Sequence, residues 1–154
     1  MELVKQPLWY TVSIYDSLEV YNQDLSSFTE GQRKIFALSW YNAEVCNGGH
    51  DQFFSNSTGI VWKDALEGMN LIGATELFEN FQKAIDKFGG VVPFGRQERM
   101  QLLDTLWEDE NFDDISELDN FYYDHNDVLE SLMMEYIKNN ASEFVVDGDF
   151  DYYE

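Results

Sequence analysis

Apolar residues recur three and four positions apart along most of the chain, which is the spacing of the buried face of an α-helix. The first such series follows Pro7 and predicts a helix over residues 8–18. A second series predicts a helix that begins at a capping box formed by Ser27 and Glu30. We expect this helix to stop at residues 47–49, Asn-Gly-Gly, because glycine suits the left-handed conformation that often ends a helix.

Four further series predict helices around residues 62–72, 77–88, 100–107 and 128–137. The β-branched runs at residues 91–92 and 144–146 are too short to support a sheet. We therefore predict an all-α fold, a single compact domain of about six or more helices. It would span residues 1–146 and be followed by an acidic C-terminal tail, residues 147–154, whose order the sequence leaves open.

Acidic residues are concentrated in the last third of the chain. The 154 residues carry a net charge of −21, and residues 101–154 contain 17 acids but a single base. Apolar residues continue through this stretch, so its acids are expected to lie on the solvent side of a folded scaffold. The candidate partner-binding residues are Asp104, Glu108, Asp109, Glu110, Asp113, Asp114, Glu117, Asp119, Asp124 and Asp127.

This charge excludes several partners. Sequence-independent binding to nucleic acid or anionic lipid depends on Lys and Arg, of which the chain has 9 against 30 Asp and Glu.

The single cysteine, Cys46, cannot form an internal disulfide. The sequence shows neither a signal peptide nor an apolar run long enough to cross a membrane, so we expect a cytoplasmic protein without a membrane partner.

Candidate enzymatic and metal-binding groups are sparse. Cys46 and His50 could form a thiol-base pair or two metal ligands, but one cysteine and two histidines cannot complete a closed zinc site. The pair His50-Asp51 would need further histidines for phosphohydrolase chemistry, and residues 147–151 lack the glycine and glutamate of an EF-hand loop. We therefore expect no catalytic residue, no metal and no cofactor, and a protein that is not an enzyme.

The arrangement of the acids suggests a function. Duplex DNA carries one negative charge per about 1.7 Å of its axis, and acids one helical turn apart lie near the phosphate spacing of one strand. The leading hypothesis is a regulatory protein that mimics DNA and blocks a basic DNA-binding partner. The alternative is an immunity protein that neutralises a basic, nuclease-type toxin with the same acids. Two further hypotheses remain: an acidic surface that serves solubility alone, and an uncharacterised enzyme or metal protein.

Residues 44–59 resemble the signature of a bacterial family of small acidic helical proteins, the DNA-mimic protein domain family. The resemblance extends over roughly residues 8–146, and its motif positions are Asn47, Gly48, Gly49, Gln52, Phe53, Phe54, Asn56 and Gly59. His50 departs from the pattern, since an aromatic residue, usually Phe, is expected there. We interpret the motif as mainly architectural: the glycines end one helix, Asn56 or Ser57 caps the next, Gln52 satisfies turn groups, and the two phenylalanines pack inward.

The resemblance also implies partners. It implies an α-helical domain that forms a homodimer and binds a helix-turn-helix transcription factor in place of its operator DNA. The shared motif does not by itself carry this mimicry to the present chain. Its support here is the clustering of acids between Asp104 and Asp127.

Overall fold

The computed structural model describes residues 11–110 and 115–145. Within these residues the chain forms six α-helices and three short 3-10 helices, and no strand. In chain order they are α2 (Leu18–Asp24), η1 (Leu25–Ser27), α3 (Glu30–Ser55), η2 (Ser57–Val61), α4 (Trp62–Leu71), α5 (Thr75–Lys87), α6 (Arg96–Trp107), α7 (Ser116–Asn139) and η3 (Ala141–Phe144). The prediction of a single compact all-α domain is confirmed, whereas the expected tail at residues 147–154 lies outside the described residues.

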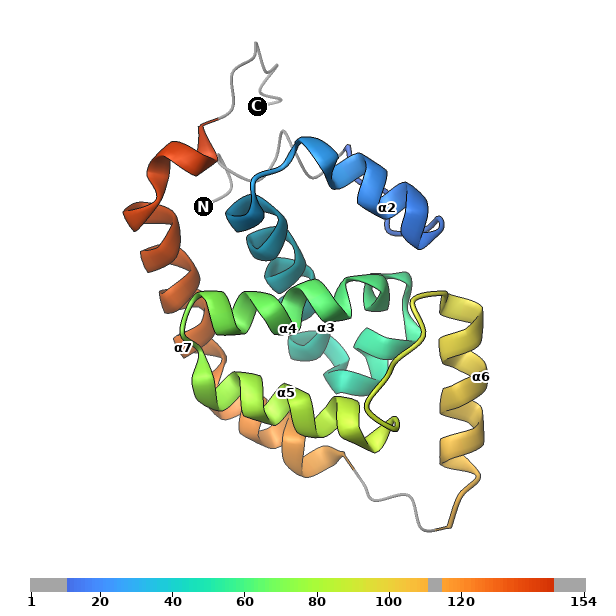
Figure 1. Cartoon of the computed structure of the whole chain (residues 1–154). Coiled ribbons are helices and arrows are strands. Elements are labelled where there is room, and N and C mark those ends of the chain that lie inside the picture. Colours follow the sequence, from blue (N-terminus) through green and yellow to red (C-terminus); the bar gives the residue numbers. More distant parts are fainter. Residues whose placement is uncertain (1–10, 111–114, 146–154) are drawn as a thin grey trace, which may run out of the picture.

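Helix α3 is the element around which the others assemble (Figure 1). It contacts α4, α6, α7, η2 and η3, and α5 in turn contacts both α4 and α7. In Figure 1, α7 runs along the left of the molecule and α6 stands on the right, with α4 and α5 between them. The acids that form one cluster in the sequence, between Asp104 and Asp127, are therefore divided between the regions of α6 and α7, which stand on different sides of the domain.

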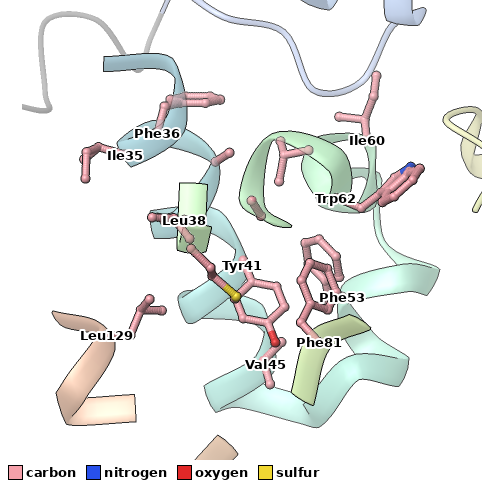
Figure 2. Close-up of a cluster of buried hydrophobic side chains, with 14 of the residues drawn as sticks. Ile35, Phe36, Leu38, Tyr41, Val45, Phe53, Ile60, Trp62, Phe81 and Leu129 are labelled. Atoms are coloured by element: carbon pink, nitrogen blue, oxygen red, sulfur yellow. The ribbon is translucent and has the colours of Figure 1, made fainter. Parts of the chain in front are cut away.

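Aromatic rings from three helices fill the centre of the core, part of which is drawn in Figure 2. The ring centroid of Tyr41 in α3 lies 4.4 Å from that of Phe81 in α5, 5.1 Å from that of Phe53 and 5.3 Å from that of Tyr122 in α7. All four side chains are fully buried. Large buried rings contribute strongly to the hydrophobic stabilisation, which here must offset the repulsion among the acids.

The helix predicted over residues 8–18 is wrong for its described part. Residues 11–17 are irregular, and α2 begins only at Leu18. Ser17 is its N-cap residue, and the side chain of Ser17 accepts a hydrogen bond from the amide of Val20. Upstream, the amide of Ser13 donates to Asp24 and its hydroxyl donates to Asp16. Such side-chain bonds to a serine compete with helical backbone hydrogen bonds, and the apolar periodicity did not reveal them.

Two other helix starts differ from the prediction. The capping box of α3 is formed by Thr29 and Gln32 and not by Ser27 and Glu30, since Ser27 belongs to η1. Helix α7 begins at Ser116, well before the predicted series at residues 128–137. The predicted starts and ends of α4, α5 and α6 agree with the structure to within a few residues.

Candidate functional site

The Asn-Gly-Gly segment divides α3 into two helical segments that meet at a kink. Gly48 and Gly49 have non-helical backbone angles, and Gly49 has a φ of 71°, which favours glycine. The helix then resumes and continues to Ser55. The predicted helix stop at the glycines is confirmed as a kink, at which the first helical segment of α3 ends and the second begins.

Asp119 of α7 closes this bend. Its Oδ1 accepts a hydrogen bond of 2.9 Å from the backbone amide of His50, the residue that directly follows the kink. A Cβ added at Gly49 would lie 2.3 Å from Asp119 Oδ2. The carboxylate therefore occupies space that glycine leaves open, and it joins α7 to the middle of α3.

His50 is fully buried between Asp119 and Tyr41. Its Nδ1 lies 2.5 Å from Asp119 Oδ1, and its Nε2 lies 2.8 Å from the hydroxyl oxygen of Tyr41. A carboxylate can only accept, so Nδ1–H donates to Asp119, and Nε2 shares the second hydrogen bond with the hydroxyl of Tyr41. Burial raises the pKa of Tyr41 well above its usual value, and the nearby Tyr122 and Asp119 add to the shift. The Tyr-His-Asp series has the order of a catalytic relay, but its imidazole is closed to solvent.

The remaining motif side chains hold the polar groups around the second half of α3. Asn47 donates to Gln52 Oε1, while the side-chain amides of Gln52 and Asn56 both donate to Glu44 Oε2. Gln52 thus bonds to side chains and not to the turn groups that were expected. Asn56 occupies the N-cap position of η2 but makes no capping bond with its side chain. Phe53 and Phe54 are fully buried, as predicted.

Arg99 binds the turn that follows α3. The side chain is 1% exposed, and it donates to the carbonyl oxygens of Phe54, Asn56, Pro93 and Phe94. A Cβ at Gly59 would lie 2.6 Å from Arg99 Nε, so this glycine permits the close approach of the guanidinium. Burial, together with Arg96, lowers the pKa of Arg99 to about 10. No pattern in the sequence indicates that this arginine is buried.

These contacts link the motif at residues 44–59 to α6 and α7. The sequence model described as DMP19-like protein matches residues 26–140. The chain belongs to this family. DMP19 is a family of DNA mimics, which supports the resemblance noted from the motif at the level of the family. No curated protein and no solved structure matches the chain.

In this member of the DMP19-like family, seven of the ten candidate acids are exposed. Asp104 lies on α6, Glu108 caps its C-terminus and Asp109 and Glu110 follow directly. We call these four residues the α6 acidic end. Glu117, Asp124 and Asp127 form the α7 acidic face on the helix that packs against α3 and α5. Asp113 and Asp114 lie outside the described residues.

Asp119 differs from the other candidate acids. Its side chain is 18% exposed and is bonded to His50, so its carboxylate serves the fold. Burial raises the pKa of the neighbouring Asp51, and the charge of Asp119 raises it further. A charge pattern alone could not separate this structural acid from its exposed neighbours, because its partner lies 69 residues away.

The structure does not bring the candidate catalytic or metal-binding groups together. Cys46 is exposed and contacts Asn42 and Asn126. His125 stacks on Phe121, and its Nδ1 bonds to that residue's carbonyl oxygen. In the described ranges, no group of three or more His, Cys, Asp or Glu side chains could hold a metal ion, and the Asp147, Asp149 and Asp151 series lies outside those ranges.

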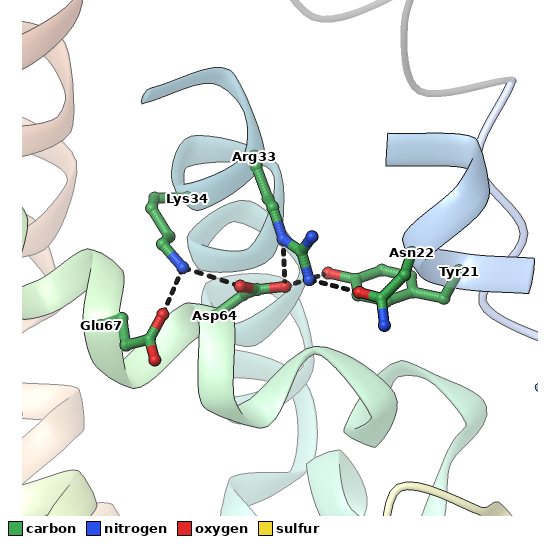
Figure 3. Close-up of polar contacts among 6 residues, drawn as sticks. All are labelled: Tyr21, Asn22, Arg33, Lys34, Asp64 and Glu67. Atoms are coloured by element: carbon green, nitrogen blue, oxygen red, sulfur yellow. Dashed lines mark hydrogen bonds and ion pairs between the residues drawn. The ribbon is translucent and has the colours of Figure 1, made fainter. Parts of the chain in front are cut away.

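A buried ionic network forms a polar cluster that the sequence patterns do not predict (Figure 3). Asp64 of α4 accepts hydrogen bonds of 2.8 Å each from Tyr21 Oη, Arg33 Nε and Lys34 Nζ, and Lys34 also pairs with Glu67. Burial raises the pKa of Tyr21, and the charge of Asp64 raises it further. These residues come from three helices that are separated along the sequence, so no local motif predicts that they form a cluster.

Among the described helices, none combines the length and the apolar character needed to cross a membrane.

Proposed function

We propose that the protein is a non-enzymatic regulator that mimics DNA and blocks a basic DNA-binding protein, such as a helix-turn-helix transcription factor. The observation that carries the proposal is the exposure of the α6 acidic end and the α7 acidic face in a chain of the DMP19-like family. A partner whose basic surface binds phosphates would meet carboxylates there instead, and the opposite charges would speed association.

Exposed aromatic residues lie beside these acids and favour a protein partner. Trp107, directly before Glu108, is 48% exposed, and Tyr123, directly before Asp124, is 42% exposed. Tryptophan and tyrosine are enriched at protein interfaces, where they supply much of the binding energy. An acidic surface that served solubility alone would gain nothing from exposing such side chains.

The proposal is tested with two variants that lose three charges each. The first carries Asp104→Asn, Asp124→Asn and Asp127→Asn in the two acidic surfaces, and it leaves Asp119 in place because that residue supports the fold. The matched control carries Glu19→Gln, Glu79→Gln and Asp86→Asn on α2 and α5, where all three residues are exposed. Because both variants have the same net charge, a difference between them reports the location of the acids.

The partner is first identified by mass spectrometry after capture from host lysate at low salt, and binding is then measured with purified proteins. We expect the first variant to bind a DNA-binding partner roughly tenfold more weakly and the control to bind like the parent. We also expect the parent to displace operator DNA from the partner and to lose affinity with added salt. Equal binding by the two variants, or simultaneous binding of the partner to DNA and to this protein, would contradict mimicry. Recovery of a nuclease that the protein inhibits would assign the immunity function in its place.

A further inference from the structure

A cleft of about 610 Å³ lies between α2, the first turns of α3 and α4. Its volume is within the range of pockets that hold small molecules, roughly 300–1,000 Å³. The apolar part of its lining includes Leu18, Leu25, Phe28 and Phe94, and its polar part includes the residues of the ionic network drawn in Figure 3. The cleft thus combines apolar walls with a few converging polar groups, which is the usual make-up of a ligand site.

The ionic network that lines the cleft is costly to bury. The side chains of Lys34 and Asp64 are 8% and 9% exposed. Removing charges from water costs several kcal/mol per ion, and apolar residues of similar volume often stabilise a fold equally well. A buried network that faces a cleft is therefore more typical of a binding site than of a purely structural one.

Two cations of the cleft keep donors that the fold does not use. Arg33 donates from Nε to Asp64 and from Nη2 to Asn22, while its Nη1 makes no hydrogen bond within the described residues, and the side chain is 30% exposed. Lys63 is exposed and forms no ion pair with any described residue. The acids of the lining, Glu30, Asp64 and Glu67, are matched by three bases, so the cleft lacks the negative excess of the whole chain.

We propose that this cleft binds a small organic carboxylate with an apolar body. The carboxylate would accept hydrogen bonds from Arg33 Nη1 and from Lys63, and the apolar body would lie against Phe28, Phe94 and Leu25. A carboxylate suits these two donors because hydrogen bonds between a cation and an ionised acceptor are stronger than bonds between neutral groups. The site involves α2, α3 and α4, whereas the acidic surfaces belong to α6 and α7, so it stands independently of DNA mimicry.

Isothermal titration of the full chain with 4-phenylbutyrate and with octanoate tests the proposal. We expect saturable binding of at least one carboxylate, and binding at least roughly tenfold weaker for its neutral alcohol analogue, which cannot replace charge-assisted hydrogen bonds. Arg33→Lys keeps a cation beside Asp64 but removes the Nη1 donor, and Lys63→Gln removes the second cation. We expect weaker binding in both variants.

Lys83→Gln is the matched control, because Lys83 is an exposed cation on α5 outside the cleft. Its affinity for the carboxylate should equal that of the parent, and circular dichroism melting should show that all three variants remain folded. Absence of carboxylate binding at millimolar concentration, equal affinity for the alcohol, or an unchanged affinity in both Arg33→Lys and Lys63→Gln would overturn the proposal.

Discussion

At Gly49 the backbone of α3 turns into a conformation that side chains oppose, and Asp119 fills the space beside it. The sequence predicts the interruption, because two adjacent glycines seldom continue a helix. It does not predict that an acid 69 residues from His50 binds the amide of that residue, since nothing local distinguishes Asp119 from Glu117 or Asp124. The same limit applies to His50, which the motif marks as unusual without indicating its two partners.

Gly49→Ala should destabilise the protein by roughly 2–4 kcal/mol. The change places a Cβ in a strained backbone conformation, and it pushes Asp119 away from the His50 amide, which leaves a buried donor unpaired. Urea denaturation followed by circular dichroism measures the loss. Gly73→Ala is the control, because Gly73 has a similar φ of 75° but no atom within 4 Å of an added Cβ. It should lose only about 1 kcal/mol, and equal losses in the two variants would show that Asp119 does not matter at this bend.

Helix α3 shows why a start signal can be misplaced by two residues. Both Ser27 with Glu30 and Thr29 with Gln32 have the spacing of a capping box, and the two pairs overlap along the sequence. The structure uses the second pair, because η1 extends through Ser27 and the chain becomes extended at Phe28 and Thr29. Local patterns thus predict that a helix begins in this region. The end of η1 determines which of the two pairs caps it.

Thr29→Ala should therefore lower the free energy of unfolding by roughly 1 kcal/mol, since it removes the hydroxyl that accepts the amide hydrogen bond of Gln32. Ser27→Ala should change it by less than about 0.5 kcal/mol, because Ser27 is exposed and does not cap α3. Thermal or urea unfolding of both variants in parallel measures the difference. A larger loss in Ser27→Ala would return the cap to the pair first expected from the sequence.

Across the whole molecule, fold class could be predicted and long-range polar contacts could not. Helical periodicity and glycine stops located most helices because they depend on neighbouring residues. The ionic network around Asp64 joins residues separated by 30 to 43 positions, and its members look like ordinary surface charges in the sequence. The exposure of most candidate acids agrees with the interpretation of the charge, and their role in binding stays a prediction.

Stability should fall at alkaline pH. Burial raises the pKa of Tyr21, Tyr41 and Tyr122 above the value of about 10 that tyrosine has in an unfolded chain. A group with a raised pKa in the fold contributes stability that is complete below the unfolded pKa and is lost as the pH rises beyond it. Urea unfolding between pH 8 and pH 11.5 should therefore show a decline that starts near pH 10. Full tyrosinate absorbance in a protein whose circular dichroism is still native would contradict this expectation.

The central position of α3 also bears on the order in which the chain folds. Its contacts with α4 are close in sequence, whereas its bonds to α7 join residues 69 to 88 positions apart, as between Asn42 and Glu130. Closing a long loop costs more chain entropy than forming a local contact, and this cost arises before the long-range contact can stabilise the fold. We expect a folding nucleus of α3 and α4 onto which α7 docks afterwards. The helix that carries much of the acidic surface would then acquire its final position only when Asp119 reaches the bend of α3.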